Sequence, residues 1–221
     1  MSYIDALFKK DEDKIYVVER DPKKGRIFTE YDARYVFYYE DARGKHRSMT
    51  GAPLQRVQCA TNKEFIKEQR IRSNKQLYEN DINPVFRCLE ENYLGKETPK
   101  LNVMFFDIEV DFDPDRGYST TDDPFMPITA ISCYMSWTDQ LVTLAVPPKT
   151  ISMDDAKELT KRFDNTMLFE KEKDMLDAFL ELVQDADILS GWNSEGYDIP
   201  YTVGRIQKVL SSDDTRRLCF W

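Results

Sequence analysis

The sequence contains a single histidine, His46, among its 221 residues. One histidine leaves one possible base for a Ser–His–Asp triad and excludes zinc sites built from several histidines. The sequence also lacks the G-x-x-x-x-G-K-[ST] phosphate loop and the G-x-G-x-x-G dinucleotide motif. What remains is carboxylate chemistry, for which the chain has 40 Asp and Glu residues.

No apolar run approaches the about 18 residues that a membrane-spanning helix needs. The first 14 residues carry acids where an export signal needs an apolar stretch. We therefore expect a protein that is neither secreted nor membrane-bound. The four cysteines are scattered and form no C-x-x-C pair, so reduced, mostly buried thiols are a better interpretation than disulfides or a zinc site.

Charge is distributed unevenly along the chain. Residues 1–100 hold 20 Lys and Arg against 17 Asp and Glu, a net charge of +3, whereas residues 101–221 hold 11 against 23, a net charge of −12. This asymmetry indicates two units with different roles. The polar, proline-containing segment 96–100 predicts the boundary, so we expect one domain over 1–100 and another over 101–221.

The first hundred residues predict strands followed by helices. Residues 14–20 and 26–40 are rich in Val, Ile, Tyr and Phe and flank the turn DPKKG, which predicts antiparallel strands. A short strand is expected over 54–59. A helix is predicted from the N-cap Asn62 to residue 73, and a second from Asn83 and Pro84 to Gly95. The expected first domain is a strand meander plus helices.

Positive charge is concentrated between residues 42 and 75, where nine basic residues accompany two acids. The basic residues are Arg43, Lys45, Arg47, Arg56, Lys63, Lys67, Arg70, Arg72 and Lys75. A solvated surface is one interpretation of this run. The other is contact with nucleic acid, because an otherwise acidic chain places its positive charge in one stretch.

The stretch Leu101–Val110, LNVMFFDIEV, predicts a strand that is buried on both faces, because five of its first six residues are apolar. Asp107 and Glu109 follow at i and i+2, so both carboxylates point to one face of the strand. Two neighbouring acids at the end of a buried strand are tolerable when a cation lies between them. The alternative is a strand end whose acids face water.

A polar loop is expected over 111–127, and its alternating acids Asp111, Asp113 and Asp115 suggest a calcium loop. An EF-hand needs Gly at the sixth position and Glu at the twelfth, where Arg116 and Asp122 stand, so the pattern argues against one. Strands are predicted over 128–137, 140–146, 166–169 and 186–192, with helices over 154–163, 170–184 and 198–210. This order predicts the α/β class, with helices on a mixed sheet.

The segment Gly191–Tyr201, GWNSEGYDIPY, places Asp198 at the start of the last helix. The helix dipole favours a carboxylate there, and the side chain can point to a site beyond the end of the preceding strand. Asn193 can bond to the backbone of the loop, and Tyr197 can pack beside the site. An ordinary helix cap is the alternative role for Asp198.

FFDIEV followed about ninety residues later by GWNSEGYDIPY resembles the first and second exonuclease motifs of family B DNA polymerases. The whole chain is similar to the amino-terminal part of polymerases of the T-even bacteriophage type. The resemblance implies a ribonuclease H-like second domain, 3′–5′ proofreading of the single-stranded end of a primer-template DNA, and a location in the cytoplasm of an infected bacterium.

The resemblance also implies roles for individual residues. Asp107 and Glu109 match the acids that bind a first metal ion, and Asp198 would hold a second ion together with Asp107. Asn193 matches the asparagine of the second motif, and Tyr197 stands where phenylalanine is common. Magnesium or manganese suits such oxygen ligands.

The resemblance places the third exonuclease motif of the family, Y-x-x-x-D, well beyond the second motif, and this sequence ends at Trp221. We therefore expect an incomplete exonuclease domain that does not polymerise by itself and hydrolyses DNA weakly or not at all. One alternative is a non-catalytic nucleic-acid-binding subunit of a split polymerase, whose partner would be a C-terminal polymerase chain. Another is an acidic α/β domain with no metal site.

Overall fold

The computed structural model describes residues 2–221. The chain divides into two compact units, unit 1 up to Pro99 and unit 2 from Lys100 to Trp221, and the division lies inside the polar segment 96–100. Within the described residues, no helix is long and apolar enough to cross a membrane. Each unit has its own hydrophobic core.

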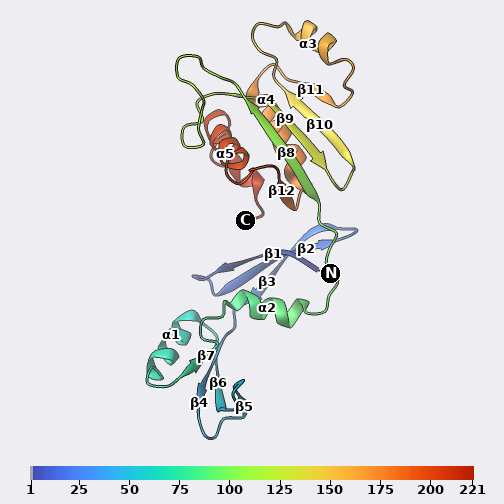
Figure 1. Cartoon of the computed structure of the whole chain (residues 1–221). Coiled ribbons are helices and arrows are strands. Elements are labelled where there is room, and N and C mark those ends of the chain that lie inside the picture. Colours follow the sequence, from blue (N-terminus) through green and yellow to red (C-terminus); the bar gives the residue numbers. More distant parts are fainter. Residues whose placement is uncertain (1) are drawn as a thin grey trace. The chain divides into compact units, whose positions relative to one another are not determined.

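Unit 1 contains two antiparallel sheets (Figure 1). The first has the order β1-β2-β3, and its strands are β1 (Ser2–Lys9), β2 (Lys14–Asp21) and β3 (Gly25–Asp32). The second has the order β5-β6-β4-β7, with β4 (Tyr35–Glu40), β5 (His46–Arg47), β6 (Pro53–Cys59) and β7 (Leu77–Tyr78). The predicted antiparallel meander is therefore confirmed.

In unit 1 the sequence analysis missed β1, and its prediction of one strand over 26–40 was wrong. β1 was not predicted, because Asp5 interrupts its apolar residues; the pairing of β1 with β2 shifts register at that residue. The predicted strand over 26–40 is two strands, β3 and β4, in different sheets. It breaks at Ala33, whose buried N–H donates to the carbonyl of Asp13 at 2.8 Å and so leaves the ladder.

Both predicted helices of unit 1 are present, as α1 (Asn62–Ile71) and α2 (Pro84–Tyr93). The N-cap of α1 is Thr61, which accepts the N–H of Glu64, so the prediction of Asn62 was one residue late. The N–H of Asn62 donates to the carboxylate of Asp13 at 2.8 Å. The predicted cap of α2 is confirmed, since Asn83 Oδ1 accepts the N–H of Val85 at 3.0 Å.

Unit 2 is built on one five-stranded sheet of order β11-β10-β9-β8-β12. Its strands are β8 (Val103–Val110), β9 (Ile128–Met135), β10 (Gln140–Ala145), β11 (Thr166–Leu168) and β12 (Ile188–Ser190). The β8–β9 and β9–β10 pairs are antiparallel, whereas β12 is parallel to β8 and β11 is parallel to β10. The predicted mixed sheet and the α/β class are confirmed.

The helices of unit 2 are α3 (Met153–Thr160), α4 (Glu172–Leu182) and α5 (Asp198–Val209), with the short 3₁₀ helices η1 (Val183–Asp185) and η2 (Asp214–Leu218). Figure 1 shows α4 behind the strands, and its fully buried side chains Met175, Leu176, Phe179 and Leu180 join the core of the unit. The same core contains residues of β8, β9 and α5.

The prediction that β8 is buried on both faces was wrong. Met104, Phe106 and Ile108 are buried against the helices. Phe105 is 47% exposed, and Asp107 and Glu109, on the same face, are exposed as well. Both faces of the strand carry apolar residues over its first half, so the sequence shows no alternation of buried and exposed positions there.

Candidate functional site

The two acids of β8 lie on the exposed face of the sheet, near the end of the strand. Their partners on β9 are small, since Asp107 pairs with Ser132 and Glu109 with Ala130. The register then shifts between Glu109 and Val110, which ends the regular ladder. Small neighbours and a strand end leave space above both carboxylates.

Asp198 reaches the same strand from α5, of which it is the first residue. Its side chain is 4% exposed, and its Oδ1 accepts the backbone N–H of Ile108 at 3.2 Å. Ile108 is the residue between Asp107 and Glu109, so this bond brings the three carboxylates to one segment of β8. Two residues that are 90 positions apart in the sequence thus meet.

Burial raises the pKa of Asp198 above its ordinary value, because a charged carboxylate loses hydration there. The backbone N–H bonds, including that of Ile108, act in the opposite direction, and the negative charge of Asp107 raises the pKa further. A cation bound beside Asp198 would favour its ionised form.

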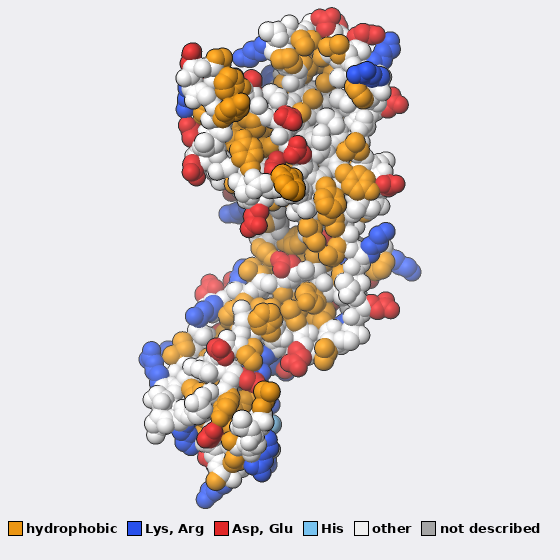
Figure 2. Space-filling view, viewed as in Figure 1, with side chains coloured by type: hydrophobic (Ala, Val, Ile, Leu, Met, Phe, Trp, Pro, Cys, Tyr) orange, Lys and Arg blue, Asp and Glu red, His pale blue; other side chains and the backbone are white. Residues whose placement is uncertain are grey.

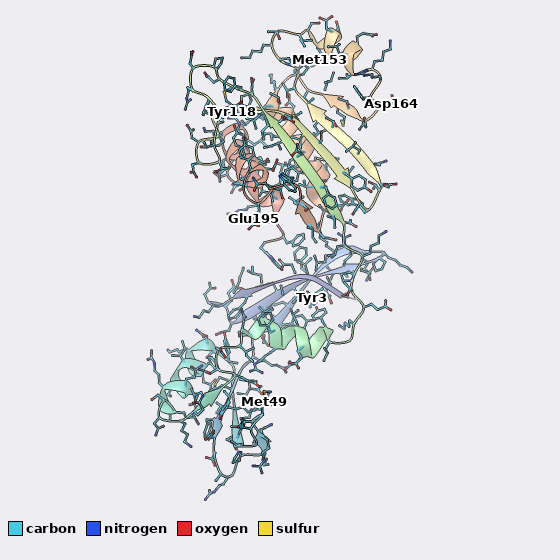
Figure 3. All side chains as sticks on the ribbon, in the orientation of Figure 1. Tyr3, Met49, Tyr118, Met153, Asp164 and Glu195 are labelled. Atoms are coloured by element: carbon cyan, nitrogen blue, oxygen red, sulfur yellow. The ribbon has the colours of Figure 1, made fainter. Side chains whose placement is uncertain are left out.

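The turn that connects β12 to α5 is closely packed on β8. A Cβ on Gly191 would lie 2.3 Å from the carbonyl oxygen of Phe106, so only glycine fits. Asn193 has a φ of +55°, and its carbonyl accepts the N–H groups of Gly196 and Tyr197 at 3.0 and 2.9 Å. Asn193 therefore shapes the turn through its backbone, while its side chain lies against Gly196. Figure 3 labels Glu195 in this turn.

Tyr197 packs beside the start of the helix. Its ring stacks on Tyr201, with centroids 5.3 Å apart and an interplanar angle of 26°. Partial burial raises the pKa of its hydroxyl, so the ring is neutral near pH 7. Tyr197 precedes Asp198 but does not cap the helix with its side chain.

Arg205 of α5 forms a buried ion pair with Glu172 of α4 and also fastens the loop 111–127 to α5. Arg205 donates to both oxygens of Glu172, at 2.8 and 2.5 Å, and to the carbonyls of Pro124 and Phe125 at 2.9 and 3.3 Å. Tyr201 donates to the carbonyl of Met126 at 2.8 Å. The segment that leads into β9 is thus held on the helix that carries Asp198. We refer to Arg205, Glu172 and their backbone partners as the clasp.

Residues 111–122, for which the sequence suggested a calcium loop, form a loop that is organised by its own hydrogen bonds. Asp113 Oδ1 accepts the N–H groups of Asp115 and Arg116, at 2.8 and 3.0 Å, as in an Asx turn. Ser119, only 5% exposed, accepts the N–H groups of Phe125 and Met126 and donates to the carbonyl of Asp123. The loop is organised by its own backbone bonds. Figure 3 labels Tyr118 at its exposed surface.

The donor set of Asp107, Glu109 and Asp198 suits a hard divalent cation, because carboxylate oxygens are the ligands that magnesium and manganese prefer. Within residues 2–221, no three Asp, Glu, His or Cys side chains are close enough together to hold one ion. Two of the three acids are exposed, and the third accepts a backbone N–H. The residues fit the ions in chemistry: Asp107 and Glu109 lie on β8, and Asp198 of α5 is bonded to Ile108 of the same strand.

The nine basic residues lie in unit 1. Figure 2 shows Lys and Arg side chains around the end of this unit that holds α1, β5 and β6. Arg72 forms an ion pair with Glu68, and Lys75 forms one with Asp41. Both cations lie over the ring of Tyr39. Arg47 donates only to the carbonyl of Gly51, at 3.4 Å. For Arg43, Lys45, Arg56, Lys63, Lys67 and Arg70, the described structure gives no carboxylate partner.

Three of these residues form one face of α1. Lys63, Lys67 and Arg70 recur at i, i+4 and i+7 and are exposed. Phe65 lies on the opposite face of the helix, where its ring packs against Tyr35, with centroids 5.4 Å apart. The structure therefore narrows the candidate nucleic-acid-binding residues to a short helical stripe, which also borders the exposed Glu64.

Sequence reasoning missed two features of the site. Trp192, in the turn before α5, is 93% exposed, and the pattern had assigned it to the end of a buried strand. Arg205 lies on the buried side of α5 together with Tyr201 and Ile206. The sequence signal for the clasp was Arg205 itself, a charged residue on the apolar face of a predicted helix.

Comparison with known proteins identifies the family. Residues 55–219 match the model of the exonuclease domain of family B DNA polymerases. The chain is 31% identical over 138 residues to a DNA-directed DNA polymerase of Escherichia phage RB69, covering 54% of this chain and 15% of that protein. It is 29% identical over 117 residues to the DNA polymerase catalytic subunit of Saimiriine herpesvirus 2 (strain 11), covering 52% of this chain and 11% of that protein.

The matched residues include β8, the turn before α5 and all three carboxylates of the site. The mixed sheet of unit 2 is consistent with the ribonuclease H-like type that the sequence motifs implied. Because the family match spans most of the sequence, the chain belongs to the exonuclease-domain family of the family B DNA polymerases.

Proposed function

We propose that the chain supplies the acids of a 3′–5′ proofreading exonuclease that hydrolyses the end of single-stranded DNA. The observation that supports this most is the bond from the Ile108 N–H to the buried carboxylate of Asp198, because Ile108 lies between Asp107 and Glu109 in the sequence of β8. Asn193 and Tyr197 would support the turn and the start of α5.

In this proposal, Asp107 and Glu109 hold one divalent ion, and Asp107 and Asp198 hold the other. Magnesium or manganese ions bound there would activate a water molecule and stabilise the departing 3′ oxygen in phosphodiester hydrolysis. Asp198 is held by the Ile108 N–H and the helix start, so its position is fixed before DNA binds. The exposed Asp107 and Glu109 would face the phosphate.

The chain spans 15% and 11% of the two polymerases that it matches, so their DNA synthesis is not transferred to it. We expect the chain alone to hydrolyse DNA weakly. A separate polymerase chain is a candidate partner. Co-elution with such a chain in gel filtration, and nuclease activity only in the complex, would support a split enzyme.

The metal site can be tested without activity. Manganese that binds only the folded chain stabilises it by about 2.7 kcal/mol at a hundred times its dissociation constant. Asp107→Ala and Asp198→Asn should abolish the manganese-dependent rise in the thermal midpoint. Asp164→Asn, a change at an exposed acid outside the site, is the matched control. An equal rise in all variants would contradict the proposal.

The direction of hydrolysis needs a separate assay. A 5′-labelled oligonucleotide shortened stepwise in manganese, with no products from a 3′-blocked substrate, would support 3′–5′ polarity. The wild-type rate should be low and should fall further in Asp107→Ala. Fast degradation that persists in Asp107→Ala would reject the assignment of the acids.

The alternative is a nucleic-acid-binding role for unit 1, favoured by the exposed stripe of Lys63, Lys67 and Arg70. Each cation that neutralises a phosphate adds about 0.7 to the slope of log affinity against log salt for single-stranded DNA. Changing all three to Gln should reduce the slope by about 2. Gln at Lys157 and Lys161, two exposed lysines of unit 2, is the control. An unchanged slope would reject this role.

A further inference from the structure

Trp192 is exposed to a degree that is rare for its size. Its side chain is 93% exposed, whereas Trp137 packs against the core of unit 2 and Trp221 is 37% exposed. Large aromatic side chains usually contribute to stability by burying their surface. Trp192 contributes no such packing to its unit, so its ring is free to contact another molecule.

The strand register places Trp192 next to the acids. β12 runs parallel to β8, and Ser190 pairs with Phe105. The following residue, Gly191, lies directly against the carbonyl of Phe106. The chain thus leaves β12 at Trp192, about one residue further along, at the level of Asp107 on the neighbouring strand. Figure 2 shows hydrophobic and acidic side chains next to each other on this face of unit 2.

The backbone beneath the ring is fixed on both sides. Gly191 lies so close to β8 that a Cβ there would meet the carbonyl oxygen of Phe106 at 2.3 Å. After Trp192, the carbonyl of Asn193 accepts two N–H groups, and the carbonyl of the buried Ser194 accepts the N–H of Ile199 at 2.8 Å. An exposed ring on a well-anchored turn loses little conformational freedom of the backbone when it binds a partner.

We propose that Trp192 stacks on an unpaired base of single-stranded DNA whose phosphate lies at Asp107, Glu109 and Asp198. This inference rests on the proposed nuclease site and adds a base-binding residue to it. Residues 101–221 carry a net charge of −12, so they repel the phosphate backbone. Affinity for DNA at this surface therefore needs an uncharged contribution, which a base on an indole ring supplies for any sequence.

Single-stranded DNA fits this surface better than an acidic peptide, which would meet the same repulsion without an aromatic face. Duplex DNA keeps its bases stacked on each other, so it offers the ring only its ends. The proposal therefore predicts a preference for single strands. Equal binding and equal fluorescence changes with a hairpin duplex would contradict base stacking.

The test uses the full chain with calcium in place of magnesium or manganese, so that a divalent cation can occupy the carboxylates while hydrolysis is suppressed. Trp221→Phe provides the background, which leaves Trp192 and the half-buried Trp137. An oligo-dT strand should quench the emission in a saturable manner. In the same background Trp192→Ala should remove the quenching and weaken binding by roughly 5- to 150-fold, whereas Trp192→Phe should retain most of the affinity.

The outcomes separate this inference from the proposed function. Unchanged emission at every oligonucleotide concentration, or equal affinity in Trp192→Ala, would overturn the stacking role. The manganese-dependent thermal shift would be unaffected by that result, because Trp192 is not a metal ligand. Conversely, loss of the manganese response in Asp107→Ala with DNA-dependent quenching retained would support both assignments. Trp192 is exposed, so its replacement should leave the fold intact, which far-UV circular dichroism checks.

Discussion

Replacing Arg205 by Met removes the cation at the centre of the clasp. Arg205 is 8% exposed, and its guanidinium contacts both oxygens of Glu172 and two backbone carbonyls of the loop 111–127. Methionine retains much of the apolar volume but none of the donors. Glu172, whose side chain is 11% exposed, would then be buried without its cationic partner.

The expected cost follows from that unpaired charge. Removing one partner of a buried ion pair typically destabilises a protein by about 3–5 kcal/mol. Glu172 retains one bond, from the N–H of Ile128 at 2.8 Å, so we expect the lower part of this range. Arg217→Met is the control, since its partners Asp177 and Glu181 are 59% and 64% exposed. Exposed pairs contribute about 0–1 kcal/mol each.

Urea unfolding followed by tryptophan emission measures the loss of stability of unit 2 in the Arg205→Met variant. The three tryptophans, at positions 137, 192 and 221, all lie in unit 2, so the signal reports on that unit. The double variant with Glu172→Gln should recover part of the loss, because no buried charge remains. If Arg205→Met costs no more than Arg217→Met, the clasp does not hold the loop on α5, and this reasoning is wrong.

Three further changes test other parts of unit 2. Gly191→Ala should cost about 1–3 kcal/mol in the same urea assay, because its Cβ would meet the Phe106 carbonyl at 2.3 Å; an unchanged midpoint would show that the turn can move. Asp198→Asn should stabilise the metal-free chain at pH 7, since burial raises the pKa of Asp198 and makes its ionised form costly. That gain should disappear as pH falls below the ordinary Asp pKa of about 4, and a gain that persists there would contradict a charge effect. Cys219 is exposed, whereas burial raises the pKa of Cys133 to about 12, so a thiol reagent at pH 8 should modify Cys219 and spare Cys133 in the folded chain, as mass spectrometry of the peptides can check.

The local elements of this chain could be predicted from the sequence because they depend on short-range patterns. Asn83 followed by Pro84 predicts the start of α2, and the structure has that cap. The apolar spacing in 170–184 predicts α4, whose bounds are Glu172–Leu182. Such signals lie within one or two turns of backbone, where capping and periodicity act.

Features that depend on distant parts of the chain could not be predicted in this way. The alternation of Phe105 and Phe106 between an exposed and a buried face is decided by where α4 packs. Likewise, Glu172 and Arg205 are 33 residues apart, and each has an ordinary place in a helix until the two are seen to meet. Periodicity shows which residues share a face of an element, but not which element covers that face.

The position of the candidate site follows from the short length of β12. This strand has three residues and ends at Ser190, opposite Phe105. A longer parallel strand would continue beside β8 and offer a backbone acceptor to the N–H of Ile108. Because β12 ends early, that N–H is taken by the carboxylate of Asp198 instead. The end of one strand therefore creates both the acceptor position that fixes Asp198 and the turn that exposes Trp192 beside it.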